Sequence, residues 1–231
     1  MRAWAKVSDV PTVTRLTAGL TAAGLALLGA AGCGDLDEAN AAPLSRESLI
    51  TEAAGQLAAG SALTYSAKYQ VAGGEVATVN RAQRPLRASY VYPGGRLIVT
   101  STVTIRCSTS TCESRTADPA AATALDDGPL ISAEAVQAML ATAALDPVVE
   151  TTPHDTTIAG RHATCLSLAG VDETPSREFD LCVTNEGALA SFTATINGKR
   201  IDQALTSYRD DLPDDAFLVP TGIKLIDKSA E

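Results

Sequence analysis

Residues 62–74 read ALTYSAKYQVAGG, and apolar side chains occupy every second position of this stretch up to its two glycines. The apolar set is Leu63, Tyr65, Ala67, Tyr69 and Val71, with polar residues between them. Side chains of a β-strand point alternately to the two faces of its sheet, so this period of two predicts a strand with one buried face. The glycine pair at 73–74 predicts a turn into a second, antiparallel strand.

Similar strand patterns continue on both sides of a helical segment in the middle of the chain. The predicted strands cover residues 76–81, 86–92, 96–106, 113–116, 148–152, 156–159, 161–168, 178–183, 188–196, 199–208 and 224–226. Residues 96–106, RLIVTSTVTIR, are rich in β-branched side chains and are predicted to form one long strand. Asn197-Gly198 predicts a hairpin turn. The connections are too short for parallel crossovers, which favours antiparallel pairing.

Two segments have the spacing of amphipathic helices instead. Residues 46–58 follow the predicted N-cap Ser45. A second helix is predicted after the N-cap Ser132, and it ends before Pro147. The first apolar face contains Leu49, Ile50, Ala53, Ala54 and Leu57, and the second contains Val136, Met139, Leu140 and Ala143.

These elements together predict an α+β fold built on one long antiparallel sheet. A sheet with this many strands is expected to curl, and the two helices are expected to cover its concave face. Residues 45–231 are enough for a single domain with a substantial core.

The segment before this domain has the layout of a secretory lipoprotein signal. Basic residues precede an apolar run, and residues 16–33 read LTAGLTAAGLALLGAAGC. This pattern predicts a signal peptide at 1–32, acyl chains such as palmitate on Cys33, and a flexible tether at 33–44. The domain would then be held at the extracytoplasmic face of the cell membrane by its lipid anchor. An uncleaved membrane anchor is the alternative.

The other four cysteines form an even set, as expected for an exported domain. Cys107–Cys112 and Cys165–Cys182 are the favoured disulfide pairs, because each pair flanks a predicted turn between two strands. A zinc site is the alternative. It is disfavoured because the cysteine spacing is unusual for zinc and because neither His154 nor His162 is placed to complete such a site.

Composition argues against two classes of function. The chain has a net charge of −9, and residues 1–32 contain three basic residues and one acid, so their removal leaves −11. Such a charge disfavours nucleic-acid binding. No nucleophile elbow, phosphate loop or zinc-protease motif occurs, which predicts no enzyme, catalytic residue, metal or cofactor. The segment Pro153-His154-Asp155 is predicted to be a loop, and the acidic pairs 210–211 and 214–215 a solvated turn rather than a calcium site.

The order of elements resembles the LolA-like lipoprotein-carrier superfamily, and in particular its exported mycobacterial lipoproteins of the LppX and LprG type. The resemblance is carried by the strand at 65–69, by TIAG at 157–160 followed by Cys165, by the strand from Leu189, and by DDAFLVP at 214–220. It implies a half-open β-barrel wrapped over helices and a cavity that holds acyl lipids or lipoproteins.

Two interpretations of the helix faces remain open. Their inward-facing residues either form an ordinary core or line such an acyl-chain pocket. The candidate cavity residues are Leu49, Ile50, Leu57, Val136, Met139 and Leu140.

The leading function is non-covalent binding or carriage of a lipid-like ligand by a monomer. The alternative is an envelope signalling or protein-interaction module without a ligand.

Overall fold

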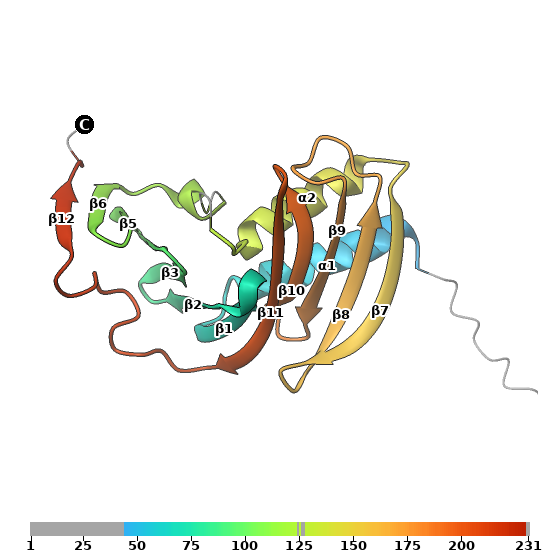
Figure 1. The fold of residues 1–231 in the computed structure, drawn as a ribbon. Coiled ribbons are helices and arrows are strands. Elements are labelled where there is room, and N and C mark those ends of the chain that lie inside the picture. The colour runs from blue at the N-terminus through green and yellow to red at the C-terminus, as the bar shows by residue number, and fades with distance from the viewer. Residues whose placement is uncertain (1–43, 124, 126–127, 230–231) are drawn as a thin grey trace, which may run out of the picture. The chain divides into compact units, whose positions relative to one another are not determined.

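The computed structural model describes residues 44–123, 125 and 128–229, which belong to one compact unit, Pro43–Glu231 (Figure 1). The predicted signal peptide, Cys33 and nearly all of the predicted tether lie outside the described residues. Within the described part of the chain, no helix is both long and apolar enough to cross a membrane.

The described residues form a mostly antiparallel, open and curved sheet of twelve strands with two α-helices. Its spatial order is β12-β6-β5-β4-β3-β2-β1-β11-β10-β9-β8-β7. In chain order the strands are β1 (Tyr65–Val71), β2 (Val76–Gln83), β3 (Leu86–Tyr92), β4 (Gly95–Thr100), β5 (Val103–Cys107), β6 (Thr111–Thr116), β7 (Glu150–Ile158), β8 (Arg161–Ala169), β9 (Glu178–Thr184), β10 (Leu189–Ile196), β11 (Lys199–Arg209) and β12 (Lys224–Asp227).

Two antiparallel meanders meet at the pairing of β1 with β11. Strands β1 to β6 form the first meander and β7 to β11 form the second, and Ala67 pairs with Tyr208 where the meanders meet. The last strand, β12, pairs with β6 and is the one parallel addition to the described sheet. The alternating sequence of β1 therefore lies near the middle of the sheet.

The predicted long strand at 96–106 is wrong, because the chain reverses within it. Strand β4 ends at Thr100 and β5 begins at Val103, and the two strands pair with each other. The Thr100 hydroxyl accepts hydrogen bonds from the backbone N–H groups of Thr102 and Val103. A threonine side chain that satisfies local backbone donors stabilises a turn, whereas β-branched composition is the same for one strand or two.

The predicted loop at Pro153-His154-Asp155 is also wrong, because these residues lie inside β7. They pair with Leu166, Cys165 and Thr164 of β8. Strand β7 is at one edge of the sheet, where proline is tolerated because no second neighbouring strand requires its missing N–H group.

Both α-helices begin where the capping residues predict. Helix α1 spans Arg46–Gly60, and the Ser45 hydroxyl accepts a hydrogen bond from the N–H of Ser48. Helix α2 spans Ala133–Leu145, and the Ser132 hydroxyl accepts one from the N–H of Ala135. Two short 3₁₀ helices, η1 (Ala72–Gly74) and η2 (Pro119–Thr123), complete the described elements.

The buried side chains form two large apolar clusters. The helix core joins α1 and α2 to strands β8–β11, and it includes Ile50, Leu140, Leu181 and Phe192. The tyrosine core joins β1–β4 to η2 and to the end of β11, and it includes Tyr65, Tyr69, Tyr90, Leu97 and Leu205. Each meander therefore buries its own apolar face, and α1 and α2 cover the second one.

Candidate functional site

A groove of about 750 Å³ lies beside α2 and is the best candidate for a binding site. It is open to the surface on one side. Its walls come from the segment before α2, from α2, from the loop at 173–175, and from the β10–β11 hairpin. The lining residues are Thr123, Leu125, Gly128, Leu130, Ile131, Ser132, Ala135, Ala138, Met139, Thr142, Glu173, Thr174, Pro175, Ile196, Asn197, Lys199 and Ile201.

Local sequence explains why these walls face one another. Ala135, Ala138, Met139 and Thr142 recur at helical spacing, so they form one side of α2. Across from them, Asn197 and Gly198 both have positive φ angles, 51° and 77°, as a tight hairpin turn requires. The Lys199 ammonium group donates a hydrogen bond to the carbonyl oxygen of Gly128 at 3.2 Å, which ties this hairpin to the segment before α2.

The chemistry of the groove suits an amphiphilic ligand. Leucine, isoleucine, alanine, methionine and proline side chains line about half of it. The polar lining residues are Thr123, Ser132, Thr142, Glu173, Thr174, Asn197 and Lys199. Apolar walls with a few polar groups are typical of small-molecule sites. Among the described residues that line the groove there is no histidine or cysteine.

The structure places most of the predicted cavity residues elsewhere. Ile50, Leu57, Val136 and Leu140 are at most 1% exposed and belong to the helix core, and Leu49 packs against the same core. Met139 belongs to the helix core and also lines the groove. The space between helices and sheet is thus filled by these side chains, and the groove lies beside this core, with which it shares Ile131, Met139 and Ile201.

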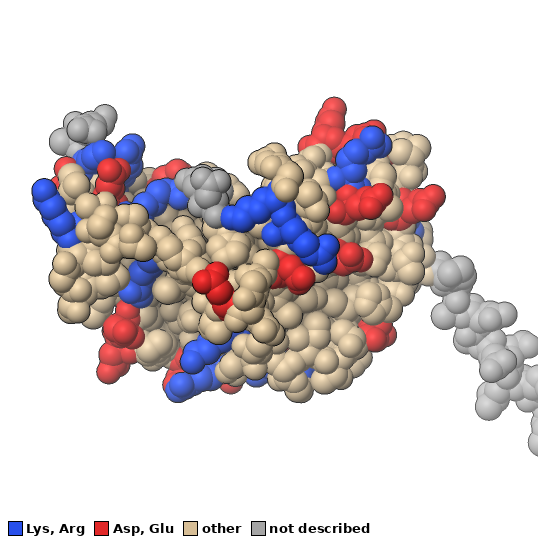
Figure 2. Space-filling model, viewed as in Figure 1, with Lys and Arg blue, Asp and Glu red and all other residues tan. Residues whose placement is uncertain are grey.

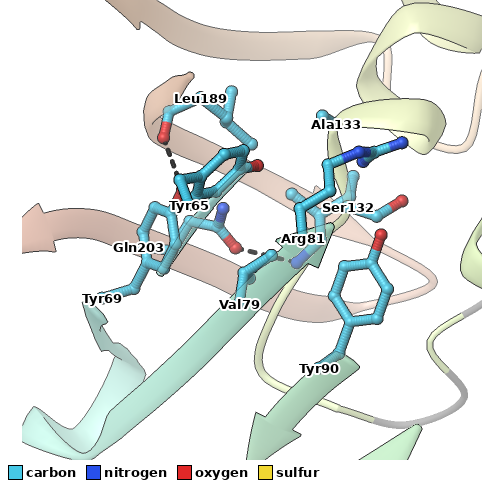
Figure 3. A pocket seen from close by; sticks show the side chains of 10 residues that line it. Tyr65, Tyr69, Val79, Arg81, Tyr90, Ser132, Ala133, Leu189 and Gln203 are labelled. Carbon is cyan, nitrogen blue, oxygen red and sulfur yellow. Dashed lines mark hydrogen bonds between the residues drawn. The ribbon is translucent and has the colours of Figure 1, made fainter. Parts of the chain in front are cut away.

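A second feature, missed by the sequence analysis, is a buried polar cluster between the two cores (Figure 3). Arg81 of β2 forms an ion pair with Glu134 of α2, with 2.5 Å between Nη1 and Oε1. The Tyr90 hydroxyl donates a hydrogen bond to the other carboxylate oxygen of Glu134 at 3.1 Å. Figure 3 shows Arg81 extending between the rings of Tyr65 and Tyr90 toward the start of α2.

Two more hydrogen bonds cross the same boundary. The Tyr69 hydroxyl donates to the carbonyl oxygen of Leu189 at 2.8 Å, and the N–H of Ile131 donates to the Gln203 side-chain oxygen at 2.8 Å (Figure 3). Burial is the main cause that raises the pKa of Tyr65 to about 12, and it also raises the pKa of Tyr69 and Tyr90. The enclosed space here is only about 10 Å³, so this cluster joins elements and does not hold a ligand.

This cluster was difficult to predict because each residue also fits a local role. Glu134 is an acid in the first turn of a helix, which is favourable there without any partner. Arg81 occupies a strand position where an exposed basic residue is common. Only the tertiary structure, which brings the first turn of α2 to Arg81 of β2 and Tyr90 of β3, shows that the two residues pair.

The four domain cysteines form the two favoured pairs. Cys107–Cys112 joins β5 to β6, and Cys165–Cys182 joins β8 to β9, each with 3.9 Å between Cα atoms. Cys107 pairs directly with Cys112 across the two strands, and Cys165 with Cys182.

Neither histidine was predicted to lie beside the cysteines of a zinc site, but the structure brings His154 close to one cysteine pair. His154 pairs with Cys165 across β7 and β8, and its imidazole lies within 4.8 Å of the sulfur atoms of Cys165 and Cys182. Cys165 is eleven positions after His154 in the sequence, and the β7–β8 hairpin brings them together. Both sulfurs are bonded to each other, so the cluster offers no thiolate to a metal.

Charges are distributed over the visible surface with both signs interspersed (Figure 2). In the predicted acidic turn, Asp211 forms an ion pair with Arg209, and this pairing is the main cause that lowers the pKa of Asp211.

Comparison with known proteins gives only distant likenesses. No protein-family profile and no curated protein sequence matches the chain. An uncharacterized conserved protein from Thermus thermophilus is 11% identical, with a TM-score of 0.47, over 77% of this chain and 98% of that one. MucB in its complex with MucA(peri) is 10% identical, with a TM-score of 0.37, over 74% and 61%. A DUF1329 family protein from Desulfovibrio piger is 13% identical, with a TM-score of 0.29, over 73% and 95%.

Proposed function

We propose that this protein binds a lipid-like, apolar ligand non-covalently in the groove beside α2. The observation that carries the proposal is the groove itself: about 750 Å³, open on one side, with apolar side chains over about half of its walls and polar residues among them. Such a site favours a ligand with an apolar body, because burying apolar surface is the main source of binding free energy here. The proposal includes no catalytic step.

The proposed place of action is the outer face of the cell membrane. The signal-like segment at 1–32 and Cys33 support export and lipid anchoring, and the two disulfides fit an oxidising compartment. The resemblance to the LolA-like superfamily points in the same direction. A lipid ligand and a lipid anchor would place the groove close to a supply of its ligand.

A second candidate function is binding of an apolar segment of another envelope protein. The open side of the groove favours this candidate, because a peptide chain can lie in an open groove without entering an enclosed cavity. The two functions make different predictions about what is bound when the protein is purified from cells.

The test is native mass spectrometry of the exported protein with Cys33→Ser, which removes the proposed acylation site. The variant Ala138→Trp places a large side chain in the groove at an exposed position of α2. The matched control is Ala141→Trp, an exposed alanine of the same helix that does not line the groove. Solvent extraction of each sample identifies any lipid.

A bound acyl lipid in the parent protein and in Ala141→Trp, lost in Ala138→Trp, is the expected result. A protein that stays free of ligand after incubation with envelope lipids would contradict lipid binding. Crosslinking of one envelope protein at position 138 but not at 141 would then support the second candidate function.

A further inference from the structure

Three of the most exposed apolar side chains gather at one end of the described domain. Leu145 is 85% exposed, Val148 is 69% exposed and Leu44 is 59% exposed. Leu145 is the last residue of α2, Val148 lies just after it, and Leu44 lies two residues before α1. We call these three residues the apolar tip.

Arg46 holds the two halves of the apolar tip together. Its guanidinium group, in the first turn of α1, donates hydrogen bonds to the carbonyl oxygens of Ala143 and Asp146 at the end of α2. The Asp146 carboxylate in turn accepts hydrogen bonds from the N–H groups of Val148 and Asp172. Leu145 and Val148 thus extend from a fixed framework, and Leu44 lies two residues before Arg46.

Nothing in the helix core needs these three side chains. The buried residues of α2 are Val136, Met139, Leu140 and Ala143, and those of α1 are Ile50, Ala53, Leu57 and Gly60. Exposed apolar groups cost free energy in water, and a group of them at one place is typical of an interaction surface.

We propose that the apolar tip rests in the surface of the membrane that holds the protein. This inference rests on the anchoring part of the proposed function, in which the chain is attached to the bilayer at Cys33. Eleven residues from Cys33 to Leu44 reach at most about 40 Å, so the first described residue and the tip beside it stay close to the membrane. Three side chains bind a bilayer weakly on their own, but attachment raises their effective concentration to about the millimolar range.

The charges beside the tip indicate which lipid surface suits it. Glu47, Asp146, Glu150 and Asp172 are acidic, and Arg46 and Arg177 are basic, so the surroundings carry more negative than positive charge. Arg177 already pairs with Asp172. A neutral, zwitterionic surface is therefore favoured over an anionic one.

The test uses tryptophan as a reporter. Trp4 is the only tryptophan of the sequence and precedes Cys33, so a chain that begins at residue 33 contains none. We would attach this chain, with Cys33→Ser and an N-terminal histidine tag, to phosphatidylcholine vesicles through a nickel-chelating lipid. This chain contains the whole compact unit with both cores and both disulfides.

The reporters are Leu145→Trp and Val148→Trp, and the matched control is Leu225→Trp on β12, where the leucine is 49% exposed.

Attachment to the vesicles should shift the tryptophan emission of both tip reporters to shorter wavelength. Brominated lipid should quench this emission relative to unbrominated lipid. The emission of Leu225→Trp should show neither the shift nor the quenching. Adding Leu44→Ser to Leu145→Trp should reduce the quenching. Unchanged emission of the tip reporters on vesicles that carry the protein would overturn the proposal, and so would equal quenching at position 225.

The attachment in this test is artificial, so its result does not depend on acylation of Cys33. The mass of the protein purified from its own membrane reports acylation separately, and the groove experiment reports ligand binding. Failure of the tip proposal and failure of the proposed function are therefore distinguishable.

Discussion

At the residue scale, the Arg81–Glu134 ion pair joins β2 to the first turn of α2 in a partly buried position. The side chains are only 11% and 25% exposed, and Glu134 also accepts the Tyr90 hydrogen bond. An ion pair this far from water contributes little net free energy when intact, but removal of one partner leaves a poorly solvated charge.

We therefore predict that Glu134→Gln lowers the free energy of unfolding by about 2–3 kcal/mol, somewhat less than for a fully buried pair because the carboxylate keeps some contact with water. Glutamine keeps the shape of the side chain and an acceptor for Tyr90. The control is Glu47→Gln, which removes an exposed acid from the equivalent first turn of α1 and so has the same effect on the helix dipole. Urea unfolding measures both variants, and equal losses would show that the ion pair is unimportant.

At the element scale, the two disulfides close loops of different length within two hairpins. Cys107 and Cys112 are 5 residues apart, and Cys165 and Cys182 are 17 apart. A disulfide restricts the unfolded chain more when it closes a longer loop.

Replacing both Cys165 and Cys182 by alanine should therefore lower the free energy of unfolding by about 3 kcal/mol, and replacing Cys107 and Cys112 by about 2 kcal/mol. Urea unfolding under non-reducing conditions checks the order of the two effects. The reverse order would mean that local packing around Cys112, which is fully buried, outweighs the loop term.

At the scale of the whole molecule, the two cores are joined by the β1–β11 pairing and by the polar cluster. All five tyrosines belong to the tyrosine core or pack against it, whereas both α-helices contribute to the helix core. Tyrosine fluorescence thus reports on one half, and helical circular dichroism reports on the other.

We predict that the two signals change at the same urea concentration, because hydrogen bonds from Tyr69 and Gln203 and the Arg81–Glu134 pair connect the halves. The measurement needs no substitution, since a chain beginning at residue 33 has no tryptophan to mask the tyrosines. Two separate midpoints would show that the halves unfold independently. Tyr69→Phe, which removes one of the connecting hydrogen bonds, should broaden the common transition or split it.

The sequence was enough to predict most local elements of this protein. Features that act through neighbouring residues were predicted close to their observed positions. They are the alternation at 63–71, the serine caps at 45 and 132, and the Asn197-Gly198 turn. The sequence also favoured the observed disulfide pairs, since each pair flanks one hairpin. Two predictions were wrong. At 96–106 composition does not distinguish one strand from two, and at 153–155 it does not distinguish a loop from an edge strand.

Which elements meet could be learned only from the folded molecule. Strand order and helix packing, which no local pattern encodes, bring residues together at three places. These are the pairing of β1 with β11, the approach of His154 to the Cys165–Cys182 bridge and the Arg81–Glu134 pair. The same holds for the groove. Apolar spacing identified the face of α2 that packs in the core, but the groove lies along the edge of that face, where residues from four separate segments form one surface.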